Sequence, residues 1–452
     1  MMQSRDTHSG TRVVTKYLTN HAEPGLATPP TGLYWDNVLC VPIYDEPPDC
    51  LEKLACFYDT LVILVVNHPD GSSTDLNKAF VDGLLNHHAH VELASHCHLI
   101  TLCASNNRHA LLIDASAGKA GFNPDQGVGL ARKIAADTAL LWWSKGVIQS
   151  NWIAQTDADA LLPSDFFDAL NELHESKVGA VHAFEHQTGD SPEHTFAMDL
   201  YEAKLHQYVS GLIESGSPYV SHAIGSCISI RPEAYAGIRG IPKRAAGEDF
   251  YCLNKLHKLG GIATFQGDSP VMLDARISTR TPFGTGQSVR AILNAPDPAE
   301  HRLFYPPEAF KALESLLGNV RDGRQTLETV LDGLPQCSAE WLIGRGLEKA
   351  LTHCRTHGRT PDQFQYHFHV WFDAFMTLKF LHSIAPPSEG LISLKALSKT
   401  LGLQPLSANQ IKVLYRDRCY KQLIDNWEGW SATKTDTAEE SRFDSYPNDH
   451  YP

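Results

Sequence analysis

Residues 152–159 read Trp-Ile-Ala-Gln-Thr-Asp-Ala-Asp, a short apolar run followed at once by two aspartates. The apolar residues predict a buried strand, so Asp157 and Asp159 stand at its carboxyl end. Two carboxylates there offer the hard oxygen ligands that Mg²⁺ and Mn²⁺ prefer, and such a metal keeps open positions for substrate phosphates. Aspartates two residues apart are a weak motif by themselves, and an acidic turn that caps a helix is the alternative.

The chain on both sides of this strand alternates between strand and helix patterns. Residues 61–66 read Leu-Val-Ile-Leu-Val-Val, which predicts a strand buried on both faces, as in a parallel sheet covered by helices. The remaining patterns predict strands at 37–44, 99–103, 110–114, 178–184 and 223–230, and helices at 49–58, 76–93, 127–141, 165–175, 198–213 and 248–259. Such alternation with long crossovers predicts an open α/β sheet with flanking helices.

Acidic residues fall at the expected carboxyl ends of several strands. Ligands of open α/β sheets bind beyond those ends. The residues concerned are Asp45, Asp114, Asp157 and Asp159. Their common position favours a ligand site at that edge of the sheet.

Changes in composition divide the chain into four parts. Residues 1–35, rich in Ser, Thr, Gly and Pro, predict a flexible arm, and residues 36–290 hold the α/β pattern. Residues 291–431 form a helical C-terminal region, and residues 432–452 a disordered polar tail. The C-terminal helices shape one side of the ligand site or pair subunits in a homo-oligomer; the sequence leaves both open.

Composition excludes some classes of partner. The formal net charge of −14 argues against binding to nucleic acid or to an anionic membrane, since both need a basic face. We expect no integral membrane segment, because the most apolar run is only strand-sized and spanning a bilayer takes ~20 apolar residues. The ten cysteines include no Cys-x-x-Cys pair, which favours reduced thiols and a cytoplasmic protein.

Three motifs resemble those of GT-A-fold glycosyltransferases of the family 2 type, over roughly residues 36–290. Residues 41–46, Val-Pro-Ile-Tyr-Asp-Glu, resemble the first-strand signature Val-Pro-x-Tyr-Asn-Glu. Asp157-Ala-Asp159 resembles the metal-binding Asp-x-Asp, and Glu248-Asp249 resembles the acidic pair on the acceptor side. The resemblance implies a metal-dependent hexosyltransferase that moves a sugar from a UDP- or GDP-linked donor to a hydroxyl acceptor, with inversion favoured.

The resemblance also implies roles for these carboxylates. Asp159 would ligate the metal, and Asp157 would contact both metal and ribose. Asp249 would act as the base that takes the acceptor proton, with Glu248 orienting it or the acceptor. The alternative is that both acids cap the helix from Phe250, where negative charge favours the helix dipole.

Nucleotide recognition is expected on the first strands. The family carries an Asp after the second strand, whereas this chain has Asn67, so the base is open and Asp114 could substitute. Arg132, with Lys133 beside it, would meet the diphosphate, or else lie on an exposed helix face. Residues 274–288 hold two arginines before a glycine-rich turn and form a lid or an ordinary loop. The full predicted nucleotide-sugar set is Pro42, Tyr44, Glu46, Asn67, Asp114, Arg132, Asp157, Ala158, Arg276 and Arg280.

Other interpretations stay open at this stage. A third metal ligand could come from His222 or His301. A nucleotidyltransferase on a related sheet is the rival enzyme class, although it would carry a Gly-rich signature with a Lys near the first strand. A degenerate scaffold that only binds nucleotide sugars is the rival without catalysis.

Overall fold

A nine-stranded sheet forms the centre of the computed structural model, which describes residues 12–47, 50–54, 57–72, 74–115, 117, 121–278, 280, 284–321 and 326–425. The strand order is β10-β7-β9-β6-β1-β2-β5-β4-β3. The strands span β1 (Asn37–Ile43), β2 (Thr60–Val66), β3 (His90–Ala94), β4 (Cys97–Cys103), β5 (Arg108–Asp114), β6 (Ile153–Gln155), β7 (Lys177–His182), β9 (Ile228–Ile230) and β10 (Gly261–Phe265). A separate pair joins β8 (Phe184–His186) to β11 (Val271–Leu273) in parallel.

Most strands of this sheet run in the same direction. β5, β2, β1 and β6 pair in parallel, and so do β7 and β10, whereas β9 lies antiparallel between β6 and β7. All residues of β2 are buried, as its unbroken apolar run predicts. The expected fold class, a mostly parallel open α/β sheet with flanking helices and a helical C-terminal region, is confirmed. The carboxyl ends of β1, β2, β5 and β6 therefore share one edge.

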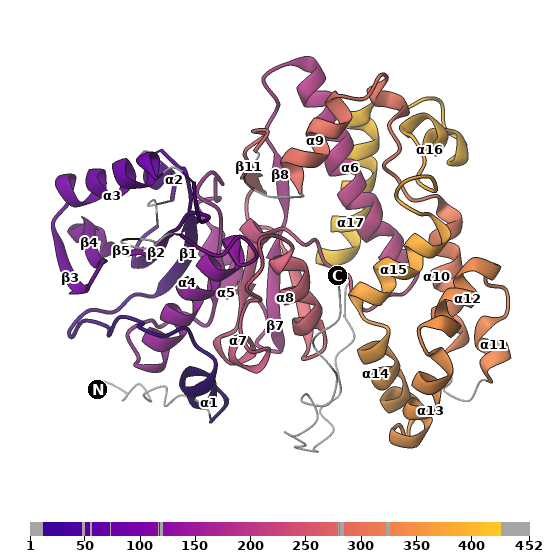
Figure 1. The fold of residues 1–452 in the computed structure, drawn as a ribbon, viewed down its shortest axis with the longest axis horizontal. Helices are drawn as coiled ribbons and strands as arrows, with labels where there is room; N and C mark the ends of the chain where they lie inside the picture. Colours follow the sequence, from indigo (N-terminus) through magenta and orange to yellow (C-terminus); the bar gives the residue numbers. More distant parts are fainter. Residues whose placement is uncertain are drawn as a thin grey trace.

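Helices cover the sheet and continue into the C-terminal region (Figure 1). Helices α4 and α8 pack on the sheet, and α17 lies along α6. The helices are α1 (Arg12–Asn20), α2 (Cys50–Leu54), α3 (Asp75–His87), α4 (Gly127–Ser144), α5 (Phe166–Asn171), α6 (Pro192–Glu214), α7 (Pro232–Gly237), α8 (Glu248–His257), α9 (Thr285–Leu293), α10 (Pro307–Asn319), α11 (Leu327–Leu331), α12 (Gln336–Gly344), α13 (Leu347–His357), α14 (Pro361–Trp371), α15 (Ala374–Ile384), α16 (Leu394–Thr400) and α17 (Ala408–Asp425).

The structure corrects the expectation of a loose arm for the part of residues 1–35 that it describes. Helix α1 buries Val14 and Tyr17 and packs on α4 and α7. The Tyr17 hydroxyl donates a 2.5 Å hydrogen bond to Asp137 on α4, and Lys133 Nζ donates to the same hydroxyl at 2.6 Å. This buried polar contact fixes the helix, and composition gives no sign of it. The tail predicted at 432–452 lies outside the described residues.

Two predicted elements have different boundaries. The helix expected over 76–93 ends at His87, and the chain then forms β3 along the edge of the sheet. The strand expected over 223–230 is a 3₁₀ turn at Gly225–Cys227 followed by the short β9. Among the helices of the described residues, none has the length and apolar character needed to cross a membrane.

Candidate functional site

Asp157 and Asp159 lie just beyond the carboxyl end of β6, as the sequence predicts. The Thr156 amide donates to the Cys40 carbonyl of β1 at 3.0 Å, which holds the start of the acidic segment against the neighbouring strand. The side chains of Asp157 and Asp159 are 37% and 21% exposed, so both can be reached from solvent. Ala158 between them is buried and anchors the turn.

Arg132 is buried beneath Asp157 and connects it to Glu248. Its Nη2 is 2.5 Å from Asp157 Oδ1, and its Nε donates to Glu248 Oε1 at 3.0 Å. Burial lowers the pKa of the guanidinium, but Asp157, Glu248 and Asp249 together raise it further, so the charge is kept. The guanidinium thus pairs with carboxylates inside the protein, and the alternative of an exposed helix arginine is wrong.

Close packing of α4 against the segment before α8 brings Arg132 to Glu248. The Gly129 amide donates to the Arg244 carbonyl at 2.9 Å. A Cβ on Gly129 would stand 2.4 Å from the Pro242 carbonyl oxygen, so only glycine permits this approach. Arg132 follows within one turn of α4. The glycines at the start of this helix therefore serve helix packing.

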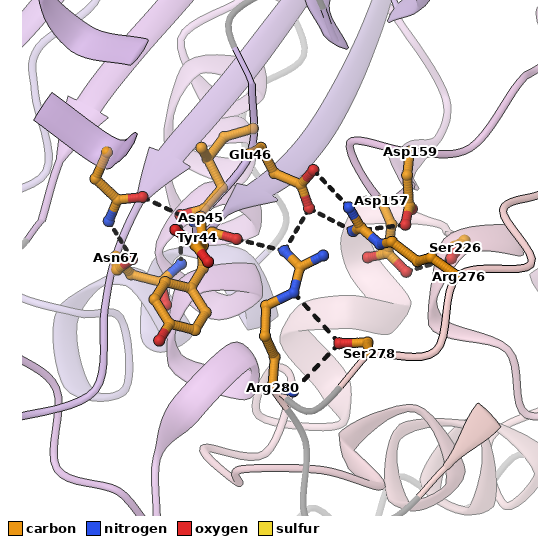
Figure 2. Close-up of polar contacts among 12 residues, drawn as sticks. Tyr44, Asp45, Glu46, Asn67, Asp157, Asp159, Ser226, Arg276, Ser278 and Arg280 are labelled. Carbon is orange, nitrogen blue, oxygen red and sulfur yellow. Dashed lines mark hydrogen bonds and ion pairs between the residues drawn. The ribbon is translucent and has the colours of Figure 1, made fainter. Parts of the chain in front are cut away.

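Ser226 holds the other oxygen of Asp157. Its Oγ donates to Asp157 Oδ2 (Figure 2). Because β9 runs antiparallel to β6, the residues before β9 lie at the same edge as the residues after β6. Gly225, next to Ser226, leaves room for the Arg132 guanidinium, since a Cβ on Gly225 would lie 2.7 Å from Arg132 Nη2. Asp157 is therefore oriented from both sides.

Glu46, Arg276 and Arg280 form a second group at this edge (Figure 2). Arg276 contacts both oxygens of buried Glu46, with Nη1 at 3.0 Å and Nη2 at 2.5 Å, and its Nη2 is 2.6 Å from Asp159 Oδ2. Arg280 Nη1 lies 2.5 Å from Glu46 Oε1 and also donates to the Tyr44 carbonyl. One carboxylate thus holds both arginines of the predicted lid segment beside the Asp-x-Asp.

Strand β11 explains why this distant segment reaches Asp159. Leu161, two residues after Asp159, exchanges backbone hydrogen bonds of 2.8 and 3.0 Å with Met272 of β11. Four residues after Met272, Arg276 is therefore near the Asp-x-Asp turn. Ser278 steadies the segment, because its Oγ accepts from the backbone amide and the Nε of Arg280 at 3.2 and 3.3 Å.

Glu248 and Asp249 begin α8, and the negative charge of Asp157 acts on both of them. Burial, the negative charge of Glu248 and that of Asp157 raise the pKa of Asp249 to about 7. Two contacts act in the opposite direction: the Phe250 amide donates to Asp249 Oδ1 at 2.7 Å, and the positive charge of Arg132 lies nearby. Burial also raises the pKa of Glu248, which Arg132 opposes. The acids stand in the first turn of α8, as the capping alternative expects, and Asp249 is in addition poised to exchange a proton near neutral pH.

The assembled group has six carboxylates and three arginines. The carboxylates are those of Glu46, Asp157, Asp159, Glu248, Asp249 and Asp274. Burial and the charge of Asp157, with smaller contributions from Glu46 and Asp274, raise the pKa of Asp159 to about 6 despite Arg276. A divalent cation would relieve this repulsion, and carboxylate oxygens are the donors that Mg²⁺ and Mn²⁺ take. Asp157 and Asp159 therefore offer oxygen donors of the right kind, and an ion bound there would compete with Arg132 and Arg276 for them.

The remaining predicted residues have varied positions. Pro42 is in β1 opposite Val65, Tyr44 follows the end of β1, and Asp114 ends β5 opposite Val66. Asn67 is buried, and its Nδ2 donates to the Ile43 carbonyl at 3.0 Å and to the Val65 carbonyl at 3.3 Å. Its amide nitrogen thus fastens the ends of β1 and β2 together.

Lys133 and His222 have partners other than the Asp-x-Asp. Lys133 contacts Asp137 at 2.8 Å and Tyr17 of α1. His222 Nε2 lies 3.0 Å from His206 Nδ1 in a buried group with Cys419. Burial and then the charge of Lys204 lower the pKa of His301, so that histidine lies near a lysine. These contacts give no support to a third metal ligand at His222 or His301.

Sequence reasoning missed Ser226, Ser278 and Asp274 as members of the site. Ser226 falls in a segment that reads as a strand, and its approach to Asp157 depends on the antiparallel direction of β9. Asp274 and Ser278 lie in the loop already singled out for its arginines. A small polar residue beside those arginines was the one available signal.

Comparisons with known proteins found only remote similarities to this chain. No protein-family model matches it, and no curated protein matches its sequence. It is similar to the structure of S. aureus TarS 1–349 in complex with UDP-GlcNAc, with 12% identity and a TM-score of 0.36 over 74% of this chain and 91% of that chain. It is also similar to the mannosyltransferase PcManGT from Pyrobaculum calidifontis in complex with GDP-Man and Mn²⁺, with 14% identity and a TM-score of 0.32 over 90% and 92%. Likenesses this remote say nothing of this chain's donor, metal or acceptor.

Proposed function

We propose that this chain is a metal-dependent glycosyltransferase that moves a sugar from a nucleotide-linked donor to a hydroxyl acceptor, with inversion. One observation carries the proposal: three arginines join the Asp-x-Asp carboxylates, Glu46 and the Glu248–Asp249 pair into one cluster at the carboxyl edge of the sheet. Ligands of open α/β sheets bind at this edge. The cluster contains groups suited to both halves of the transfer.

The donor half would use the Asp-x-Asp and the arginines of the 274–280 segment. Asp157 and Asp159 would hold Mg²⁺ or Mn²⁺, which when bound stabilises the charge on a departing diphosphate. Arg276 would turn from Glu46 and Asp159 to the diphosphate oxygens, because arginine makes bidentate contacts with phosphate, and Arg280 would keep Glu46 neutralised beside it. We infer that the nucleoside lies along the ends of β1, β2 and β5, beside Tyr44, Asn67 and Asp114.

The acceptor half would use Asp249. Its carboxylate would take the proton of the acceptor hydroxyl as that oxygen bonds to the anomeric carbon, while the bond from that carbon to the diphosphate oxygen breaks. A base is most effective when its pKa is near the working pH, and the pKa of Asp249 is about 7. Glu248, fixed by Arg132, would keep Asp249 in place.

We further infer that residues 36–290 form the transferase domain and that the helices of 291–431 complete its acceptor side. Helix α6, within the first of these ranges, packs with α10 and α17 of the second. Its Val209 and Leu212 belong to the same buried cluster as Leu313 and Phe380. The two ranges thus share a core, which favours one folded unit over a loosely tethered second domain.

A donor screen tests the function. The wild-type protein would be incubated with UDP- and GDP-sugars, with and without Mn²⁺, and release of the nucleoside diphosphate measured. We expect metal-dependent release with one donor, and its loss in Asp159→Asn. Asp82→Asn, an exposed substitution on α3, is the matched control and should keep full activity. Undiminished release in Asp159→Asn would contradict the metal assignment.

The same assay separates the alternatives. A nucleotidyltransferase would consume a nucleoside triphosphate and release pyrophosphate. The binding-only scaffold has one observation in its favour, because Asp157 and Asp159 are both paired with arginines. It would bind a nucleoside diphosphate in a calorimeter and release none from any donor.

A further inference from the structure

A cavity of about 290 Å³ lies between α8, the helix that begins with Glu248 and Asp249, and the C-terminal helices. Phe250 and Leu253 of α8 line one side, and Ile224 lines another. Phe250 follows Asp249 directly, and Ile224 precedes the Gly225–Ser226 turn that contacts Asp157. The lining residues Phe250, Leu253, Asn254 and His257 form one face of α8, and Asp249 stands in the first turn of the same helix.

The opposite walls come from α6 and from residues beyond 300. Lys204 and Tyr208 of α6, Tyr305, and Leu378 and His382 of α15 line this side. His382 Nε2 is hydrogen-bonded to the Tyr305 hydroxyl at 2.9 Å, and the two rings stack. The C-terminal helices therefore complete the cavity. Its volume is near the lower end of the range for ligand pockets, about 300–1,000 Å³, so its occupant is compact.

The lining is mainly apolar and aromatic, and it contains a single lysine, Lys204, whose pKa is lowered by burial. Lys204 Nζ has no hydrogen bond or ion pair within the described part of the chain. Burial lowers the pKa of His382 to about 4 and that of His257, another lining residue, to about 3, so both are neutral near pH 7. None of the lining residues, all of them described, is an aspartate or a glutamate. A bound acid group would supply the counter-charge that favours the protonated form of this amine.

From this charge pattern we infer that the cavity is the acceptor site and that the acceptor is a compact aromatic hydroxy compound carrying one acid group. The acid would pair with Lys204, the ring would lie against the apolar wall, and the hydroxyl would face Asp249. The inference rests on the proposed function, because it assigns the acceptor of that same transfer.

Binding of two probes tests the assignment. We would titrate the wild-type protein with 4-hydroxybenzoate, which has the acid, and with its methyl ester, which lacks it, by isothermal calorimetry. Lys204→Met keeps the length of the side chain and removes its charge, and we expect it to weaken binding of 4-hydroxybenzoate about 10-fold or more, the scale of a hydrogen bond to a charged group. Binding of the ester should change little.

Two further variants complete the design. Leu378→Trp fills the cavity and should weaken binding of both probes, while Lys349→Met, at an exposed lysine of α13, should change neither. Circular dichroism would verify that each variant is folded. Equal loss of acid and ester in Lys204→Met, or wild-type protein that binds neither probe at millimolar concentration, would overturn the inference.

The donor screen keeps this failure distinct from failure of the proposed function. Probe binding that depends on Lys204, together with no release from any donor, would retain the anion pocket and refute glycosyl transfer. Donor turnover that Lys204→Met and Leu378→Trp leave unchanged with 4-hydroxybenzoate as acceptor would retain the transferase and refute this pocket as its acceptor site.

Discussion

The pH dependence of transfer should report the ionisation of Asp249. Burial and the adjacent charge of Glu248 raise its pKa from 3.8 to about 7. A base works only when deprotonated, so with this pKa about one tenth of the enzyme is active at pH 6 and about nine tenths at pH 8. The turnover number at saturating donor, metal and acceptor should thus rise about tenfold over this interval. At saturating donor and metal concentrations, protonation of Asp159 in the donor site should not affect the measured turnover number.

A variant of the neighbouring acid makes this prediction specific. Glu248→Gln keeps an oxygen that can accept from Arg132 Nε but removes the negative charge beside Asp249. The pKa of Asp249 should fall, and the acid limb of the profile should move to lower pH. Asp249→Asn should lower the turnover number at least about 10²-fold at every pH and leave donor affinity unchanged. A profile that is flat from pH 6 to 8, or that Glu248→Gln leaves in place, would refute Asp249 as the base.

Three further outcomes follow from the same contacts. Arg132→Met should lower the free energy of unfolding by about 3–5 kcal/mol in urea denaturation, because Glu248 is left buried without its cation; Arg359→Met, at an exposed arginine, should cost far less. Asp249→Asn should raise the free energy of unfolding at pH 8 more than at pH 4. The raised pKa means that the folded state disfavours the charged carboxylate, so the wild-type protein loses stability as the pH rises from 3.8 to about 7, whereas the variant with an uncharged amide does not. Mn²⁺ affinity, measured by calorimetry, should weaken as pH falls through about 6, where protons compete for Asp159; a constant affinity from pH 7 to 5 would contradict its role as ligand.

The sequence was sufficient for the parts of the site that depend on strand order alone. Parallel strands bring their carboxyl ends to one edge, and the apolar runs followed by acids predicted that Asp114, Asp157 and Asp159 lie at or just beyond those ends, where the structure has them. It was insufficient wherever a contact depends on direction or on which helix face is buried. Ser226 reaches Asp157 only because β9 is antiparallel, and three residues of strand carry no sign of their direction.

Arg132 also shows that the sequence does not indicate which face of a helix is buried. Arg132 was expected to meet a diphosphate or solvent, since a helix pattern does not say which neighbour covers a given face. The structure buries it between Asp157 and Glu248, with a side chain 5% exposed. The role of Tyr17 is equally hidden, because a polar arm gives no indication that one hydroxyl will hydrogen-bond with Lys133 and Asp137.

Exposure decides which arginines can serve the donor. The side chains of Arg276 and Arg280 are 35% and 21% exposed and lie on a loop, whereas Arg132 is fixed within a helix. An ion pair in contact with water is worth about 0–1 kcal/mol, while breaking a buried pair costs about 3–5 kcal/mol. Glu46 is as buried as Glu248, but it is paired with two arginines, so a diphosphate can draw Arg276 away while Arg280 still neutralises the carboxylate. Glu248 pairs with Arg132, and drawing that arginine away would leave the carboxylate buried without this cation. The residue first suggested by its motif is thus better suited to holding the site together, and Arg276 of the loop to binding the donor.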